Sequence, residues 1–238
     1  MPPLQGFEFP NESPTQGFAL GWHNIAPLGL KSLRLKSRTM AILPHDFYNR
    51  DPVIVARELI GMHLVRRTPQ GLCGGVIVET EAYLATDDPA SHSFRGLTRK
   101  NATMFGRAGL LYVFPIHGRY CLNAVTQARG IATAVLIRAV QPLQGIEIMQ
   151  QRRHCPPLDL ARGPARLCEA FAVDRRLDGW DLTRGTRIWI EWLDEAAFRD
   201  QQIAVSPRIG VTSGHSLELR FYLNDNPHVS GPRRVRDS

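Results

Sequence analysis

Two glutamates and a tyrosine stand close together in an apolar run of the chain. Glu79, Glu81 and Tyr83 occupy every second position, so on a β-strand their side chains would project from one face. A carboxylate within hydrogen-bond reach of water can take a proton from it during attack, and a neighbouring aromatic ring can stack on a planar substrate. Taken alone, the pattern favours a solvated strand face, and a water-activating site is the alternative interpretation.

A histidine and an asparagine further along could complete a polar pocket. His92 lies in a segment that also contains Asp87 and Asp88, and Asn123 ends the run Tyr120–Asn123. A zinc site needs three or four ligands, and neither HExxH nor HxE followed by PCxxC occurs in the sequence. The spacing therefore predicts no metal, and we expect no cofactor. A surface histidine in a loop is the other interpretation of His92.

Four basic residues follow His92, interspersed with short hydroxyl and amide side chains. Positive charge beside such donors is suited to a phosphate backbone, although a solvated charged loop explains the pattern equally well. The formal net charge of +7 also favours a polyanionic partner. A nucleotide-binding P-loop is not indicated, because Gly106–Gly109 lacks the lysine and hydroxyl residue that it requires. The candidate backbone contacts are Arg95, Arg99, Lys100 and Arg107.

Turn and cap signals divide the chain into short elements of mixed type. Asp51 and Pro52 predict a helix over about 52–60 that ends near Gly61. The runs 62–67 and 72–83 flank a turn at 68–71 and predict a hairpin. This order indicates an α+β protein with a mostly antiparallel sheet. Further strands are expected at 110–114, 119–125, 133–140, 187–193 and 217–222, helices at about 142–153 and 164–172, and long loops that line a site at 84–102 and 154–163.

The two ends of the chain differ in composition from its middle. Residues 1–39 are rich in Pro, Gly and Ser and are expected to form a flexible extension. Residues 40–232 are expected to form one domain, followed by a basic tail at 233–238. Met40 precedes a segment typical of a domain opening, which raises the hypothesis that the natural start lies there.

The cysteines and the hydropathy pattern indicate in which cellular compartment the protein is expected. The four cysteines show no CxxC spacing and predict free thiols in a reducing environment. No apolar run reaches the length of a membrane span, and no signal peptide is indicated at the N-terminus. We therefore expect a soluble, cytoplasmic protein that does not contact membranes.

Sequence blocks spread over most of the chain resemble those of one known family. Each block alone is weak evidence, but their common order is specific. The chain resembles the alkyladenine, or 3-methyladenine, DNA glycosylase family. The blocks are Glu79–Tyr83, His92, Met104–Phe105, Leu111–Val113, Tyr120–Asn123, Leu136–Ala139, Gly163–Leu167, Pro207–Gly210, Arg220–Tyr222 and Asn226–Pro227.

The resemblance implies a fold and an activity. The fold is a single mixed α+β domain with a curved, mostly antiparallel sheet flanked by helices. The activity is DNA repair, in which alkylated or related damaged purines are flipped out of double-stranded DNA and their N-glycosidic bonds are hydrolysed. The positions that match the family contain no lysine that could form a Schiff base, so we expect a monofunctional enzyme that leaves an abasic site.

The resemblance also assigns the catalytic positions. Glu81 matches the carboxylate that orients and deprotonates the attacking water, and Glu79 matches a neighbouring position without that role. Arg138 matches an arginine near the catalytic water.

The base-binding positions follow from the same resemblance. Tyr83 and His92 match residues that pack against the flipped base, and the main chain of His92 offers an acceptor to the base edge. Phe114 replaces a tyrosine that closes the other side of the base. Asn123 matches the amide that disfavours the 2-amino group of ordinary guanine.

The chain departs from the family between Tyr112 and Asn123, where relatives usually have one more residue. A Tyr-Gly pair, whose tyrosine wedges into the DNA, is replaced here by His117 and Gly118. Histidine offers less stacking area than tyrosine, and the resemblance implies that His117 takes the wedge position. Pro115 predicts an edge strand or a bend.

The expected partner is double-stranded DNA containing damaged purines, bound by a monomer with no obligate protein partner. Two other functions stay open. A non-catalytic nucleic-acid-binding module would keep the fold, and the altered residue His117 favours it while Glu81 argues against it. A hydrolase of free nucleosides would have little use for the basic segment.

Overall fold

The computed structural model describes residues 41–193 and 202–231. The expectations for the extension at 1–39, the start at Met40 and the tail at 233–238 lie outside these residues. The described elements alternate between short helices and strands. They are α1 His45–Tyr48, α2 Pro52–Glu58, β1 His63–Thr68, β2 Gly71–Tyr83, η1 Ala102–Phe105, β3 Leu111–Ile116, β4 Arg119–Thr126, β5 Thr133–Gln144, α3 Ile146–Arg153, η2 Pro157–Asp159, α4 Pro164–Ala170, η3 Arg175–Leu177, η4 Leu182–Arg184, β6 Ile188–Glu191, β7 Ile203–Ser206 and β8 Arg220–Leu223.

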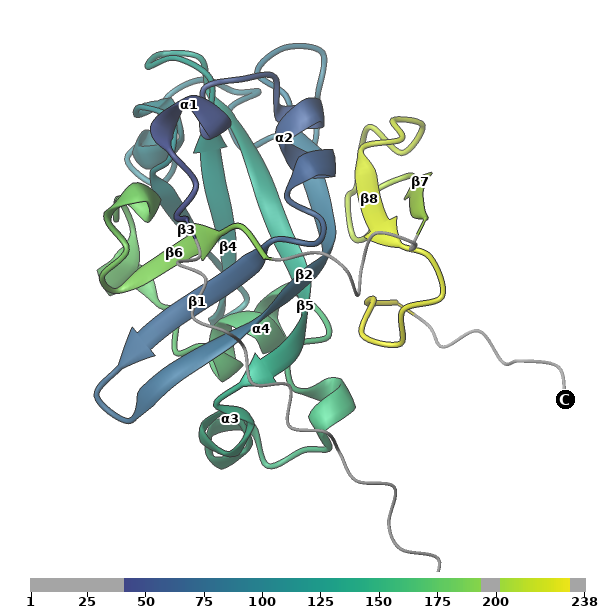
Figure 1. Cartoon of the computed structure of the whole chain (residues 1–238). Coiled ribbons are helices and arrows are strands. Elements are labelled where there is room, and N and C mark those ends of the chain that lie inside the picture. The colour runs from purple at the N-terminus through teal and green to yellow at the C-terminus, as the bar shows by residue number, and fades with distance from the viewer. Residues whose placement is uncertain (1–40, 194–201, 232–238) are drawn as a thin grey trace, which may run out of the picture. The chain divides into compact units, whose positions relative to one another are not determined.

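One curled antiparallel sheet organises these elements (Figure 1). Its main path runs β3-β4-β5-β2-β1-β6, and β8 adds β7 to the side of β2. The long strand β2 pairs with β5 over most of its length, with β1 at its beginning and with β8 near its end. The α+β class and the curved antiparallel sheet are therefore confirmed. The central position of β2 matters most, because Glu79 and Glu81 lie in this strand.

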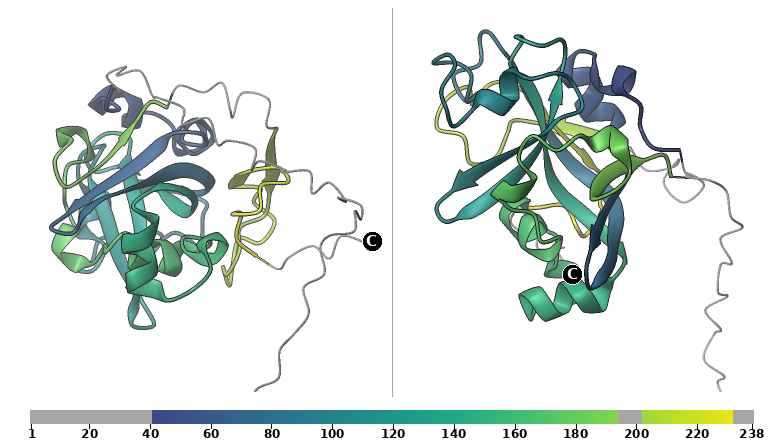
Figure 2. Two further views of the ribbon diagram at one scale, coloured as in Figure 1. Left: turned by 60° about the horizontal axis from the view of Figure 1, so that its bottom comes forward. Right: turned by 90° about the vertical axis from the view of Figure 1, so that its left-hand side faces the viewer.

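The helices cover the sheet and close its core (Figure 2). Asp51 caps α2 as expected, since its side chain accepts hydrogen bonds from the backbone N–H groups of Val53 and Ile54. Helix α2 packs over β2 and β5, and α4 packs against β4 and β5. Thr80 faces α2, where its hydroxyl donates to Ala56 O at 2.8 Å. The glutamates on either side of Thr80 consequently face away from this helix.

Two elements differ from the sequence expectation. The helix expected at 142–153 starts only at Ile146, because Pro142 and Gln144 extend β5 and pair with the beginning of β2. Gly145, with φ of 70°, then turns the chain, and a side chain there would collide with the carbonyl of Leu72. Strand β7 was not anticipated from the sequence. Pro115 lies in the edge strand β3, as expected.

Candidate active site

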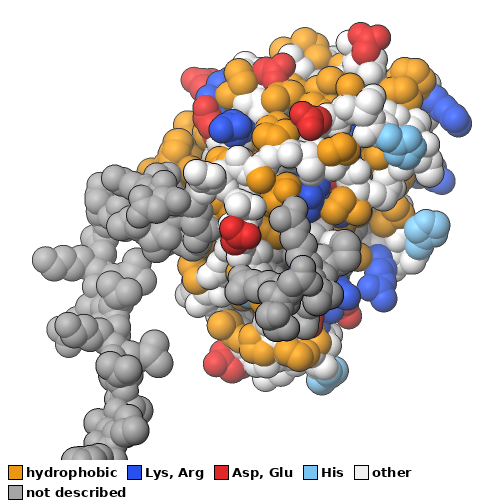
Figure 3. Space-filling view, turned by 90° about the vertical axis from the view of Figure 1, so that its right-hand side faces the viewer, with side chains coloured by type: hydrophobic (Ala, Val, Ile, Leu, Met, Phe, Trp, Pro, Cys, Tyr) orange, Lys and Arg blue, Asp and Glu red, His pale blue; other side chains and the backbone are white. Residues whose placement is uncertain are grey.

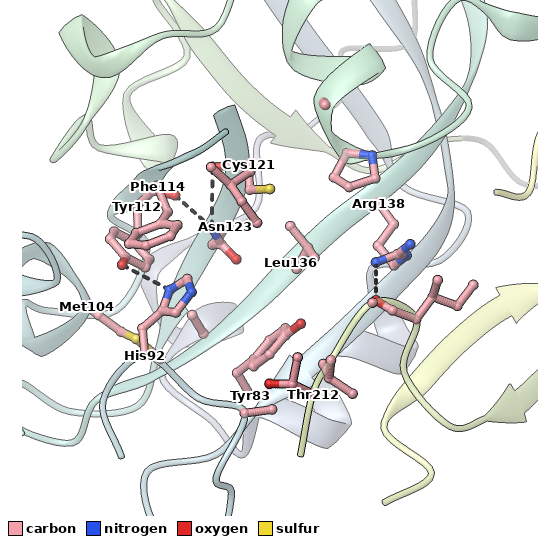
Figure 4. Close-up of a pocket in the computed structure, with 18 of the residues that line it drawn as sticks. Tyr83, His92, Met104, Tyr112, Phe114, Cys121, Asn123, Leu136, Arg138 and Thr212 are labelled. Carbon is pink, nitrogen blue, oxygen red and sulfur yellow. Dashed lines mark hydrogen bonds between the residues drawn. The ribbon is translucent and has the colours of Figure 1, made fainter. Parts of the chain in front are cut away.

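A cavity of about 420 Å³ opens beside the end of β2. This volume lies within the usual range for sites that enclose small organic groups. Its walls come from segments far apart in the sequence, including the loop after β2, the strands β3 to β5 and the segment 209–212. Ten of the lining residues are labelled in Figure 4, namely Tyr83, His92, Met104, Tyr112, Phe114, Cys121, Asn123, Leu136, Arg138 and Thr212.

The long loop that follows β2 contributes to this cavity. Pro89, Ala90 and His92 line it, in agreement with the expectation for residues 84–102. The second long loop, at 154–163, provides none of its lining residues. That loop instead joins α3 to α4, and the cavity wall begins with Pro164 at the start of α4.

Glu81 is fully buried and does not itself line the cavity, but its three partners, Tyr83, Arg138 and Ile209, do. Its Oε1 atom lies 3.1 Å from a guanidinium nitrogen of Arg138 and accepts a hydrogen bond of 2.8 Å from the backbone N–H of Ile209. Its Oε2 atom accepts a hydrogen bond of 3.0 Å from the hydroxyl of Tyr83. A carboxylate has about four acceptor positions, so the two hydrogen bonds and the ion pair do not use all of its acceptor capacity.

Glu79 is also fully buried but has different partners. Its Oε1 atom lies 2.9 Å from Arg138 Nε and 2.7 Å from Arg220 Nε. The backbone N–H of Ser230 donates to Oε2 at 2.7 Å. A solvated strand face, which the pattern alone had favoured, is therefore wrong for both glutamates. They belong to a buried cluster of two carboxylates and two guanidinium groups whose formal charges cancel.

The surroundings of the two glutamates move their pKa values in opposite directions. Burial raises the pKa of Glu81, and the favourable effects of Arg138, Ile209 N–H and Tyr83 do not fully offset it. Burial acts on Glu79 as well, but the attraction of Arg138 and Arg220 and the hydrogen bonds that it accepts outweigh burial, so its pKa is lowered. Glu79 consequently stays an anion, whereas Glu81 is the better proton acceptor.

The aromatic residues form two unequal walls. The rings of His92 and Phe114 lie only 3.8 Å apart between centroids, at an interplanar angle of 33°. Because no base fits between these two rings, His92 and Phe114 form a single wall of the cavity. The expectation that Phe114 closes the other side of the base stays a prediction. Tyr83 faces this pair across the cavity (Figure 4). A planar group in the cavity would thus lie between Tyr83 on one side and His92 with Phe114 on the other.

Two hydrogen bonds fix the residue at position 92. The ring nitrogen Nδ1 of His92 lies 3.1 Å from the hydroxyl of Tyr112. The side-chain amide of Asn101 donates to the carbonyl of His92 at 2.8 Å. This carbonyl is the acceptor that the resemblance assigns to the base edge, and it retains a second lone pair. Neither Tyr112 nor Asn101 was assigned a role from the sequence.

Asn123 is buried in β4 with its amide held in place. Its Nδ2 atom donates to the carbonyl of Tyr112 at 3.0 Å and to that of Cys121 at 3.4 Å. The amide cannot swing aside without losing both bonds, so it forms a rigid part of the cavity wall (Figure 4). Burial raises the pKa of the neighbouring thiol of Cys121 to about 11, which keeps it protonated at neutral pH.

The four basic residues after His92 do not behave alike. Arg95, Arg99 and Lys100 are exposed, and no ion pair of theirs occurs within residues 41–193 and 202–231. Arg107 instead lies 2.6 Å from Asp181, so its charge is already paired. Sequence reasoning missed the exposed apolar residues of the same loop, Phe94 and Leu97, which are 52% and 65% exposed.

His117 lies at the tip of the β3–β4 hairpin. It has a φ of 45°, and Gly118 follows with a φ of 75°, which is the backbone of a tight two-residue hairpin turn. Ile116 next to it is 42% exposed and also lines the cavity. The sequence had suggested only His117 as the DNA wedge at this tip. The structure adds Ile116 as an exposed apolar neighbour.

The surface over β7 and β8 carries side chains of both charges (Figure 3). Basic side chains and histidines are frequent along the right-hand edge of this view (Figure 3). Among the residues that the structure describes, no three His, Cys, Asp or Glu side chains are grouped as metal ligands would be. None of the described helices is long and apolar enough to cross a bilayer.

Comparison with known proteins decides the family. The model of the methylpurine-DNA glycosylase family matches residues 46–227. This chain belongs to the methylpurine-DNA glycosylase family. It is therefore a DNA glycosylase, a hydrolase of N-glycosyl bonds in DNA, and the resemblance described from the sequence is confirmed.

Relatives of this glycosylase from distant organisms cover most of its length. A protein of Rhodopirellula baltica is 43% identical over 79% of this chain and 83% of its own length. A protein of Carboxydothermus hydrogenoformans is 44% identical over 79% of this chain and 98% of its own length. A protein of Granulibacter bethesdensis is 44% identical, with 82% of this chain and 90% of its own length covered. Each of the three carries the name "Putative 3-methyladenine DNA glycosylase".

Proposed function

We propose that this glycosylase removes alkylated purines, with 3-methyladenine as the model substrate, by flipping them into the cavity beside Tyr83. Water activated by Glu81 then hydrolyses the N-glycosidic bond. The observation that carries the proposal is the position of Glu81, which is buried, has a raised pKa and is bonded to three groups that all belong to cavity-lining residues. A carboxylate of raised pKa beside an aromatic pocket is the arrangement that general base catalysis on a stacked base requires.

The chemical step balances without a cofactor. The water oxygen forms a bond to the sugar carbon C1′ while the bond from C1′ to the purine nitrogen breaks, and the bonding electrons leave with the base. Glu81 accepts the proton that the water releases. A purine alkylated on a ring nitrogen carries positive charge and leaves as a neutral molecule, so it needs no further proton. A neutral purine such as hypoxanthine leaves as an anion and takes up one proton from solvent water. Arg138 holds the carboxylate in place and stabilises its charged form before attack.

The aromatic walls and Asn123 support selection of the base. A flipped purine would stack on Tyr83 and against His92 and Phe114, which offsets part of the cost of leaving the duplex. We propose that the rigid amide of Asn123 leaves no room for the 2-amino group of guanine.

The β3–β4 tip supports a role in opening the duplex. We infer that His117 enters the space that the flipped nucleotide leaves, and that Ile116 adds apolar contact beside it. Apolar side chains that insert between base steps are a known means of keeping a duplex distorted. The exposed charges of Arg95, Arg99 and Lys100 would hold the flanking phosphates.

The decisive experiment uses duplexes that each contain one defined lesion. Excision is measured under single-turnover conditions by cleaving the abasic site with alkali. Strands that stay intact before alkali is added indicate a monofunctional enzyme. Glu81→Gln should lower the rate constant by about 100-fold or more and keep most of the DNA affinity. Full activity of this variant, or no excision by the unaltered protein from any alkylated or deaminated duplex, would defeat the proposal.

A competition experiment separates this function from hydrolysis of free nucleosides. Excision from a lesion duplex is followed with excess undamaged duplex or with excess free nucleoside. Competition by the duplex alone supports the DNA substrate, whereas release of base from the free nucleoside at a similar rate would favour the small-molecule function.

A further inference from the structure

A buried ion pair lies behind the aromatic ring of Tyr83. Arg208 binds Asp88 through two hydrogen bonds of 2.7 and 2.6 Å, and both side chains have no exposed surface. The guanidinium carbon of Arg208 lies 4.6 Å from the centre of the Tyr83 ring. The Nε atom of Arg208 is buried and has no hydrogen-bond partner among the residues described. The ring of Tyr83 is thus a principal contact of this guanidinium group.

The same pair is attached to the backbone on both sides of Tyr83. Arg208 donates a hydrogen bond of 3.1 Å to the carbonyl of Ala82. Asp88 accepts a hydrogen bond of 3.0 Å from the backbone N–H of Leu84. Residues 82 and 84 are therefore held by the two partners of one ion pair, and the tyrosine between them has a fixed position.

Both members of the pair are charged at neutral pH. Burial raises the pKa of Asp88, but the hydrogen bonds from Arg208, Leu84 and Ala90 outweigh burial, and its pKa is lowered. An arginine stays protonated under the same conditions. The ring of Tyr83 consequently has a cation close to it and a carboxylate bound to that cation, so the formal charges of the pair cancel.

We propose that Arg208 and Asp88 are positioning residues that set the electrostatics of Tyr83 so that the pocket accepts neutral as well as cationic purines. The inference rests on the proposed stacking of the base on Tyr83. An aromatic face attracts a cation through its quadrupole. A positive charge on the rear face weakens that attraction, and a negative charge strengthens it. The balance of the pair therefore determines how strongly the pocket prefers a charged lesion.

Single substitutions should move this preference in opposite directions. Arg208→Met leaves the carboxylate of Asp88 and should raise the ratio of cationic to neutral base excision by about threefold to tenfold. Asp88→Asn leaves the guanidinium group and should lower the ratio by a similar factor. The double variant Asp88→Asn with Arg208→Met removes both charges and should bring the ratio back toward that of the unaltered protein.

The test compares two lesions at one position of the same duplex, 3-methyladenine as the cationic base and hypoxanthine as the neutral one. Neither base carries the 2-amino group that Asn123 is proposed to exclude. The readout is the ratio of their single-turnover excision rate constants, each corrected for spontaneous loss of base. Asp87→Asn is the matched control, because Asp87 is exposed and its φ of 56° suits asparagine. This control should leave the ratio unchanged.

The outcomes separate an electrostatic role from a purely structural one. Loss of packing alone would slow excision of both bases by the same factor and leave the ratio constant in every variant, which would overturn the inference. Arg208→Lys keeps the positive charge and should retain the ratio even if both rates fall, so it provides a readout if Arg208→Met does not fold. Excision of only the cationic base by the unaltered protein would also overturn the inference. Excision of neither base would instead defeat the proposed function.

Discussion

The hydroxyl of Tyr83 donates a hydrogen bond of 3.0 Å to Oε2 of Glu81. One residue thus touches both functional parts of the site, since its ring lines the cavity and its hydroxyl reaches the carboxylate. A hydrogen bond to the charged form of a carboxylate favours that form. In the proposed mechanism, the same tyrosine would stack on the purine and favour the charged form of Glu81, which accepts the proton.

Removal of this hydroxyl should change the pH dependence of excision. Tyr83→Phe keeps the ring and deletes a donor to Glu81, so the pKa of Glu81 should rise further. The carboxyl group of Glu81 must be ionised to accept a proton from water. The excision rate therefore increases as pH rises through the pKa of Glu81. The acid limb of the rate profile should consequently move to higher pH, while affinity for the lesion duplex changes little. An unshifted limb, measured in single-turnover mode from pH 4 to 8, would show that Glu81 is not the titrating base.

Glu79 should contribute to stability rather than to chemistry. Glu79→Gln removes one partner of a buried charge cluster and should lower the free energy of unfolding by about 3 kcal/mol. Glu58→Gln is the matched control, because Glu58 pairs with Arg50 at the surface, is 46% exposed and should contribute less than about 1 kcal/mol. Thermal unfolding at pH 7 compares the two variants, and equal melting temperatures would contradict the assignment.

The contribution of Glu79 should also depend on pH. Its pKa in the folded protein is lowered below the value of about 4.3 for an unfolded chain. Such a group stabilises the fold fully above the unfolded pKa, and this stabilisation is lost as pH falls through the folded pKa. The difference in melting temperature between the unaltered protein and Glu79→Gln should therefore be constant above about pH 5 and shrink at lower pH. A difference that grows on acidification would contradict the sign of the shift.

The hairpin tip should matter most when the duplex is intact. His117→Ala and Ile116→Ala should each slow excision from a fully paired duplex by about threefold to tenfold. The same lesion opposite a mismatched base is already partly unstacked, so its excision should be less affected. The ratio of the two rate constants is the measurement. If His117→Ala leaves it unchanged and Ile116→Ala lowers it, the apolar neighbour is the wedge.

The salt dependence of DNA binding should identify the phosphate contacts. Each contact that is lost lowers the slope of log affinity against log salt by about one. Substitution of Arg95, Arg99 or Lys100 with alanine should have this effect. Arg107→Ala is the internal comparison, because Asp181 already pairs with that arginine and its removal should change the slope less. Equal slopes for all four variants would contradict the assignment of Arg95, Arg99 and Lys100, rather than Arg107, as phosphate contacts.

The sequence predicted the elements with strong local signals. Asp51 and Pro52 marked the start of α2, and the alternation of Glu79, Glu81 and Tyr83 placed these side chains together on one strand. Local pattern could not tell that this strand lies in the middle of the sheet. The difference decides the chemistry, since a carboxylate on a solvated face has an ordinary pKa and a buried one does not.

The partners of the site residues were beyond local pattern. Glu79 meets Arg220 and Ser230, which follow it by more than a hundred positions in the chain. Arg208 occurs in a sequence block that resembles the family, but only the fold brings it behind Tyr83. The close contact between His92 and Phe114 likewise depends on the path of the loop after β2. The contact partners of the site residues therefore depend on contacts between distant parts of the chain, which local spacing in the sequence cannot predict.

The β3–β4 hairpin joins two tasks in one piece of backbone. His117 lies at its tip, and Phe114 and Asn123 lie on its two strands within the cavity wall. These strands are paired along their whole length from Leu111 to Ala124. A force that DNA exerts on the tip would be transmitted along these paired strands to Phe114 and Asn123 in the cavity wall. If the tip inserts into the duplex as proposed, insertion and recognition of the purine are mechanically linked, and a poorly seated tip would leave the pocket misaligned for hydrolysis.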